Sequence, residues 1–167
     1  QRFHREVRIT AQLEHPNIVP VHDVGVTEDG THFFCMKLVG GQSLAEMLTD
    51  LRASAREKKG HHDGTRLLGD FLKMCDALQF AHSRDIVHRD LNPRSIFVHQ
   101  VGASGDFVKL FDFRIGIPTS AQRDSLVSQD PHYMAPEQIR GEGVSSKTDL
   151  YAVGVLGYHL LTGHPPY

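Results

Sequence analysis

Apolar positions recur at helical spacing in two long stretches of the chain. In residues 66–83 they form a stripe about one helix face wide, made of Leu68, Phe71, Leu72, Met74, Cys75, Leu78 and Ala81. Residues 147–161 follow two serines and are apolar on nearly every side. A helix of this kind is normally buried, so we expect it at the centre of the core.

Runs of β-branched and aromatic residues predict two hairpins. Residues 18–26 and 31–39 flank Glu28-Asp29-Gly30, which is a strong hairpin turn signal. A second pair of short strands is predicted at residues 96–99 and 108–111, joined by a glycine-rich turn.

Shorter helices and loops complete the predicted order. Residues 2–14 mix apolar and charged side chains, which predicts a short amphipathic helix that ends at His15-Pro16. Residues 43–52 follow a Gly-Gly break and predict a helix capped by its first serine. The polar residues 53–64 are typical of a surface insertion, and residues 113–132 have no periodicity, so we expect a long loop there.

The composition is that of one globular domain. The chain has 167 residues, of which 40% are apolar and 23% charged. A net charge of −2 provides no basic field, which argues against a nucleic-acid or anionic-membrane partner. No apolar run approaches the ~20 residues of a membrane span, and the two cysteines lie in apolar stretches, which favours buried thiols in a reducing cytoplasm. Because the chain starts at Gln1 inside a helical pattern, we expect it to be an internal piece of a longer protein.

Three short motifs in a fixed order carry the candidate chemistry. They are His88-Arg89-Asp90-Leu91, Asp112-Phe113 and Tyr133-Met134-Ala135-Pro136-Glu137. In protein kinases the corresponding motifs open the catalytic loop, form the metal-binding turn and close the activation segment. The order of elements and motifs resembles the eukaryotic-type serine/threonine protein kinases of bacteria over essentially the whole chain.

The resemblance implies an α+β, protein-kinase-like fold that is truncated at both ends. Residues 1–39 would be the end of the small β-rich lobe with the hinge. Residues 40–167 would be most of the mainly helical large lobe, ending after its central helix.

The resemblance also implies a role for each residue of the motifs. Asp90 is expected to accept a hydrogen bond from the substrate hydroxyl, and Asp112 to coordinate a magnesium ion that bridges the phosphates of ATP. Asp149 is expected to accept hydrogen bonds from the backbone near His88 and Arg89, because a carboxylate on an apolar helix needs such partners. Two further matches are structural, namely Phe113 in the metal-binding turn and Glu137, whose arginine partner would lie beyond Tyr167.

Four positions match the parts of a kinase that bind nucleotide. Glu6 matches the helix glutamate that pairs with a strand lysine, and that lysine would lie before Gln1. The backbone of Lys37 and Val39 would meet the adenine edge, and the Phe97 side chain would lie under the adenine.

Several residues in and near the catalytic motifs differ from the kinase pattern. Asn92 replaces a lysine that neutralises the transferred phosphoryl group. Ser95 replaces an asparagine that binds a metal ion, and the serine hydroxyl is about one bond too short to reach the position of the asparagine oxygen. Arg114 replaces the glycine of the metal-binding turn, and Gln129-Asp130 replaces a Gly-Thr pair whose threonine links the catalytic aspartate to the missing lysine. These changes add negative charge around ATP, so we expect ATP and magnesium to bind weakly.

This pattern is compatible with three functions. The first is an ATP-dependent kinase of serine or threonine hydroxyls in proteins, with a degraded catalytic site. The second is a pseudokinase that binds a nucleotide or a signalling partner without transferring phosphate. The third, a small-molecule phosphotransferase, is disfavoured because such enzymes lack the Tyr133–Glu137 segment. The partner is accordingly a protein substrate or a signalling protein.

Overall fold

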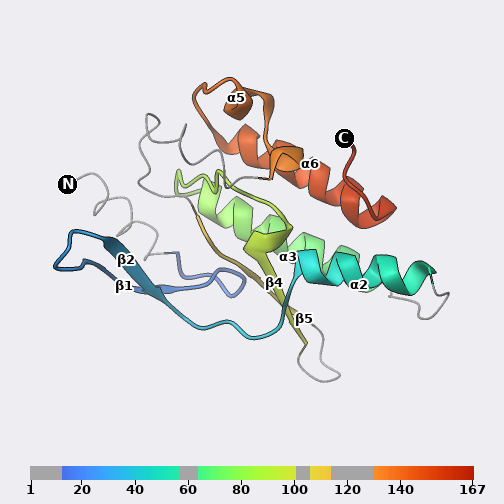
Figure 1. The fold of residues 1–167 in the computed structure, drawn as a ribbon, viewed down its shortest axis with the longest axis horizontal. Coiled ribbons are helices and arrows are strands. Elements are labelled where there is room, and N and C mark those ends of the chain that lie inside the picture. The colour runs from blue at the N-terminus through green and yellow to red at the C-terminus, as the bar shows by residue number, and fades with distance from the viewer. Residues whose placement is uncertain (1–12, 57–63, 101–105, 114–129) are drawn as a thin grey trace.

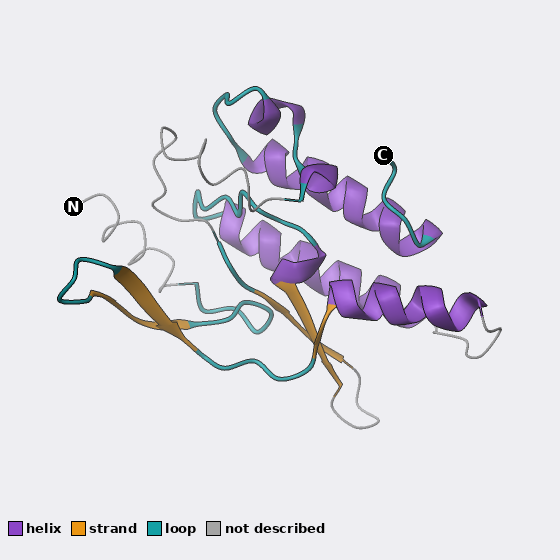
Figure 2. Cartoon of the chain, viewed as in Figure 1, coloured by secondary structure: helices purple, strands orange, loops and turns teal. Residues whose placement is uncertain are grey.

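The computed structural model describes residues 13–56, 64–100, 106–113 and 130–167 (Figure 1). Its strands are β1 (Val21–Val26), β2 (His32–Met36), β3 (Gln42–Ser43), β4 (Ile96–Gln100) and β5 (Asp106–Leu110). Its helices are α2 (Leu44–Arg56), α3 (Gly64–His82), α5 (Pro136–Ile139) and α6 (Ser146–Thr162), with 3-10 turns η1 (Pro93–Ser95) and η4 (Pro131–Tyr133). The long helices gather on one side of the molecule and the strands on the other (Figure 2). The predicted α+β class is confirmed.

Both predicted hairpins are present. Strands β1 and β2 pair antiparallel, with Val26 opposite His32 and an irregularity between Val21 and Asp23. Gly30 at the turn has a φ of 85°, a conformation that glycine adopts without steric cost. Strands β3, β4 and β5 form a second, antiparallel sheet.

The segment before β1 joins the second sheet. Leu110 of β5 donates its amide to the Asn17 carbonyl (2.8 Å) and accepts from the Val19 amide (2.9 Å). Ile18, between them, is buried at 2% exposure. This strand-like contact joins the start of the described chain to the end of β5, just before Asp112.

Helix α2 is longer than the sequence predicted. Its start is as expected, because Ser43 and Glu46 form a reciprocal cap in which the Glu46 carboxylate accepts from the Ser43 amide (2.7 Å). The helix then continues to Arg56, so residues 53–56 belong to α2 and not to the surface insertion. Alanine and arginine in this stretch are strong helix formers, which accounts for the extension. Helices α3 and α6 match their predicted ranges within two residues.

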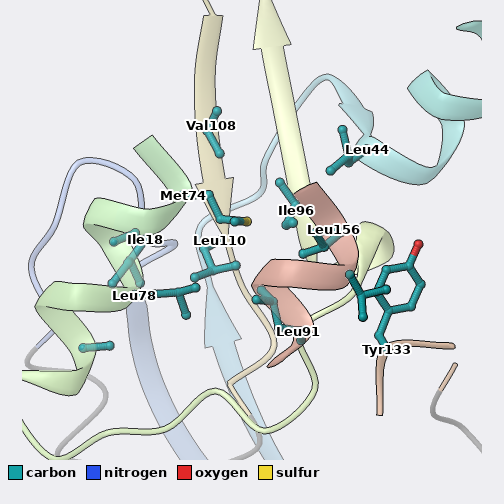
Figure 3. Close-up of a cluster of buried hydrophobic side chains, with 14 of the residues drawn as sticks. Ile18, Leu44, Met74, Leu78, Leu91, Ile96, Val108, Leu110, Tyr133 and Leu156 are labelled. Carbon is teal, nitrogen blue, oxygen red and sulfur yellow. The ribbon is translucent and has the colours of Figure 1, made fainter. Parts of the chain in front are cut away.

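The core lies between α3, the β4–β5 pair and α6 (Figure 3). It includes Met74, Leu78, Ile96, Val108, Leu110 and Leu156, all at most 2% exposed. Only one face of α6 is buried, because Leu150 and Leu161 on its other face are 60% and 86% exposed. In the described part of the chain, α6 therefore contributes one face to the core, where α3 packs against it, and exposes apolar side chains on the other face.

Some sequence predictions fall outside the described residues. These are most of the helix predicted at residues 2–14, including Glu6, most of the loop at 113–132, and the positions of Arg114 and Gln129. None of the described helices is both long enough and apolar enough to span a membrane.

Candidate functional site

A buried carboxylate on α6 organises the loop that carries Asp90. Asp149 is 1% exposed, and its two oxygens accept from the backbone amides of His88 (2.8 Å) and Arg89 (2.9 Å). The His82 ring, at the end of α3, lies 2.6 Å from the same carboxylate. The hydrogen bonds predicted for Asp149 are therefore present. Its place in the first turn of α6 also suits a negative charge, since helix N-termini are electropositive.

The backbone is strained at both ends of the site. Arg89 and Asp112 have φ values of 71° and 63°, in the left-handed region that non-glycine residues rarely adopt. Each such residue costs about 1–2 kcal/mol, and residues of this kind persist where the surrounding structure fixes them, often at functional sites. At Arg89 the fixing contact is the hydrogen bond from its amide to Asp149.

His88 connects the Asp90 loop to the Asp112 turn. The ring is fully buried, and its Nε2 lies 2.9 Å from the Phe111 carbonyl oxygen, which can only accept. Nδ1 then accepts from the Asp90 amide (3.4 Å), so the hydrogen bonds assign a neutral imidazole protonated at Nε2. Burial lowers the pKa of His88, which agrees with this assignment. Phe113 packs on the same ring, with 4.5 Å between ring centroids.

Asn92 and Ser95 close a tight turn directly after Asp90. The Asn92 side-chain amide donates to the Asp90 carboxylate (3.2 Å) and to the Asp90 carbonyl (2.9 Å), and its oxygen accepts from the Arg94 amide. The Ser95 hydroxyl donates to the Asn92 carbonyl (2.9 Å), accepts from the Asn92 amide (3.2 Å) and is 3% exposed. Ser95 would have to leave this turn to bind a metal ion, so the geometry disfavours it as a ligand.

Asp90 and Asp130 line the same small pocket, next to Arg89 and Tyr133. Asp130 caps η4, where its carboxylate accepts from the His132 amide (3.2 Å). The structure thus brings together the two carboxylates that the sequence placed near each other. One side chain that donates to Asp90 is the neutral Asn92, at the place where the kinase pattern has a lysine.

The residues matched to nucleotide binding lie along the segment between the two sheets and on β4. Lys37 donates its amide to the Pro20 carbonyl (3.3 Å). Val39 is half-buried, and Phe97 packs edge-to-face on Phe111 with 5.2 Å between centroids.

Asp112 is exposed, as a carboxylate that binds a solvated ion must be. Among the residues that the structure describes, no group of three or more His, Cys, Asp or Glu side chains is arranged to hold a metal. A magnesium ion needs few protein ligands when phosphate oxygens and waters fill the rest of its shell. The site therefore fits one magnesium ion held by Asp112 together with a nucleotide.

A second network ties α2, η4 and α6 together. The Arg52 guanidinium lies 2.8 Å from Nε2 of His159 and also donates to the Gly163 carbonyl, while Nδ1 of His159 contacts the Tyr133 hydroxyl. Because a guanidinium can only donate, Nε2 accepts, and a neutral His159 carries its proton on Nδ1 and donates it to Tyr133. Burial is the main reason that the pKa of Tyr133 is raised, so its hydroxyl stays protonated.

The buried position of His159 predicts that the folding free energy depends on pH. Burial lowers the pKa of His159, and the neighbouring Arg52 lowers it further. The charged or titratable groups that face His159 are Arg52, Asp130, His132, Tyr133 and His164. The unfolded chain therefore takes up this proton at a higher pH than the folded chain, and His88 behaves in the same way.

We expect the folding free energy to be fully present above about pH 6.5 and to decrease as the pH falls below it. Urea unfolding at a series of pH values measures this, and His159→Gln, which keeps a donor and an acceptor without titrating, should reduce the slope. An unchanged slope in His159→Gln would contradict the assignment.

Three residues that shape the site were not predicted from the sequence. His82 and Arg52 reach Asp149 and His159 from helices far away in the sequence. Gln138 donates to the Arg89 carbonyl (2.7 Å), 49 residues away in the chain. The available signal for Gln138 was its place at the third position of the helix that starts at Pro136, where Gln often caps the helix start. Glu137 was predicted to have a distant arginine partner, and in the described chain its carboxylate accepts from the Thr148 hydroxyl (2.7 Å).

Comparisons with known proteins agree with the motifs. The protein kinase domain family model matches residues 1–167. Serine/threonine-protein kinase pkn3 of Myxococcus xanthus is 36% identical over 99% of this chain, and PrkC of Bacillus subtilis is 33% identical over all of it. The crystal structure of the Mycobacterium tuberculosis PknI kinase domain superposes with a TM-score of 0.74 at 29% identity over 99% of this chain. The chain spans 30% of pkn3, 24% of PrkC and 58% of the PknI kinase domain.

Proposed function

The chain belongs to the protein kinase domain family, with relatives among bacterial serine/threonine kinases, and from this premise we propose that it is the central part of a protein kinase domain whose catalytic site is impaired. The whole protein would transfer phosphate from ATP to serine or threonine hydroxyls of a protein substrate, slowly. Residues 1–39 would contribute to the small lobe and hinge, and residues 40–167 to the large lobe. We propose that it acts in the cytoplasm.

The turn formed by Asn92 and Ser95 is the observation that carries this proposal. Charge neutralisation and a second metal site are two contributions that phosphoryl transfer needs from this loop. Asn92 brings no positive charge, and the Ser95 hydroxyl is buried and bonded within the turn. This arrangement supports an impaired catalytic site.

The remaining residues of the site keep parts that a transfer reaction uses. Asp90 would accept a hydrogen bond from the acceptor hydroxyl and orient it, while Asn92 and His88 hold the Asp90 side chain and amide. Asp112 would hold one magnesium ion. Protein kinases use ATP with Mg²⁺, and when bound the ion neutralises charge on the phosphates. The direct test of the proposal compares the transfer rate of the protein with that of its Asp90→Ala variant.

The second candidate function is that of a pseudokinase that binds a nucleotide or a signalling partner. The pocket shared by Asp90 and Asp130 favours it, because two carboxylates repel the γ-phosphate that a transfer reaction must bring close. An Asp90→Ala variant with the same transfer rate as the parent, combined with measurable nucleotide binding, would support this second function.

We expect magnesium to add little to the affinity for ATP. Among the residues that the structure describes, Asp112 is the one metal ligand that we propose, so a single weakly held ion would link the protein to the phosphates. Calorimetric titration of ATP with Mg²⁺ and with EDTA should give affinities within a few-fold of each other, and Asp112→Asn should remove the difference. A strong dependence on Mg²⁺ that is lost in Asp112→Asn would contradict the single weak site and favour an unimpaired kinase.

A further inference from the structure

Gln138 on α5 connects the loop that carries Asp90 to the segment that carries Asp130. Its Nε2 donates to the Arg89 carbonyl (2.7 Å), in the loop that carries Asp90. Its Oε1 accepts from the Ala135 amide (3.0 Å), at the end of the segment that carries Asp130 and Tyr133. Gln138 is half-buried and lines the pocket with Asp90 and Asp130.

The hydrogen bond between Gln138 and the Arg89 carbonyl acts on the peptide group directly before Asp90. The orientation of the peptide group between Arg89 and Asp90 determines the direction in which the Asp90 side chain leaves the backbone. Its carbonyl is held by Gln138, its amide by His88, and the preceding amide by Asp149. The hydrogen bond to His88, at 3.4 Å, is long, whereas that to Gln138 is short and well within the ordinary range.

The Arg89 backbone also needs such support. Its φ of 71° is strained, and a strained residue relaxes if its hydrogen bonds are removed. Asp149 fixes the amide side of Arg89 from α6, and Gln138 fixes the carbonyl side from α5. The two contacts come from different elements, so loss of Gln138 would free one side of Arg89 while leaving the other in place.

We infer that Gln138 is a positioning residue for Asp90, which sets the orientation of the Asp90 carboxylate through the Arg89 carbonyl and couples it to residues 130–135. This inference rests on the proposed role of Asp90. A primary amide of this length supplies both a donor for Arg89 and an acceptor for Ala135. Glutamate would keep the acceptor but place an oxygen against the Arg89 carbonyl, and methionine would fill the space with neither.

The experiment uses Gln138→Glu and Gln138→Met in the full-length protein. Gln79→Glu and Gln79→Met, at an exposed position of α3, are the matched controls. Transfer is measured as kcat and KM for ATP, and hydrogen exchange of peptides covering residues 88–91 is followed by mass spectrometry. Both Gln138 variants should lower kcat by about tenfold, which is what one ordinary hydrogen bond is worth, with KM unchanged. They should also speed up exchange at residues 88–91, and the Gln79 variants should do neither.

The exchange measurement separates this inference from the proposed function. If the parent transfers no phosphate beyond its Asp90→Ala variant, the proposed transfer fails, and faster exchange confined to residues 88–91 still supports the positioning contact. Unchanged exchange in both Gln138 variants overturns the inference. So does a general loss of protection across α5 and α6, which would mean that Gln138 only stabilises the fold. Gln138→Glu keeps the hydrogen bond with the Ala135 amide, whereas Gln138→Met loses it. Equal changes in kcat and in exchange for the two variants would therefore be assigned to the lost hydrogen bond with the Arg89 carbonyl.

Discussion

Replacing Asp149 with alanine is expected to destabilise the folded chain by about 3–5 kcal/mol, since removing one partner of a buried charged network leaves the others unsatisfied. The carboxylate is 1% exposed and serves the His88 amide, the Arg89 amide and the His82 ring together. Alanine would leave the buried His88 amide and the part-buried Arg89 amide without this partner and release the strained backbone at Arg89. Urea unfolding followed by circular dichroism measures the loss.

Two further variants are controls for the stability of Asp149→Ala. Asp76→Ala removes an exposed carboxylate from α3 and should change the stability by no more than about 0.5 kcal/mol. Asp149→Asn keeps the volume but turns an amide group toward donors, so it should also be strongly destabilised. An Asp149→Ala protein as stable as Asp76→Ala would show that water replaces the carboxylate and that Asp149 does not hold the loop.

The contacts of Asp149 are the part of the site that the sequence predicted best. A single acid in an apolar helix must find donors, and the resemblance to protein kinases places these donors in the backbone near His88 and Arg89. Local pattern alone placed α3, α6 and both hairpins within a few residues. It failed at the end of α2, where helix propensity continued the helix through residues that looked like an insertion.

The arrangement of Ser95 and Gln138 could not be predicted in this way. Ser95 was placed as a metal ligand from its position in the motif, and only the closed turn shows that its hydroxyl is already bonded to Asn92. Gln138 reaches Arg89 across 49 residues of chain, a contact that depends on how α5 packs against the loop and leaves no periodic signal. Hydrogen bonds between distant segments are set by tertiary structure, and the sequence around Gln138, unlike that around Asp149, provided no match from which its partner could be inferred.

The largest gain in activity is expected from restoring the kinase pattern at three positions together, with Asn92→Lys, Ser95→Asn and Asp130→Thr. The lysine would neutralise charge on the transferred phosphoryl group, and removal of one such electrostatic stabiliser typically costs on the order of 10²–10³ in rate. Threonine at 130 would remove a carboxylate from the pocket of Asp90, and asparagine at 95 would supply a second metal ligand.

The three changes should be strongly non-additive. Asn92 and Ser95 hold each other through two hydrogen bonds in a turn where Ser95 is 3% exposed, so the larger asparagine fits only if the turn opens. Changing Asn92 alone removes the hydrogen bond to the Asp90 carboxylate without providing the second metal site. Each single variant is therefore expected to gain little, and the triple variant to gain roughly 10²-fold or more.

Transfer of radiolabelled phosphate from ATP to a generic basic protein measures this gain in the full-length protein. Asp90→Ala in the parent and in the triple variant provides the blank, because both should lose transfer that depends on this carboxylate. Ile139→Gln, at an exposed position of α5, controls for an unrelated surface change. If the unaltered protein already transfers phosphate at about 1–100 per second, the range of ordinary kinases, then the Asn92–Ser95 turn does not impair the site. In that case this domain performs transfer with a neutral amide where other kinases use a lysine.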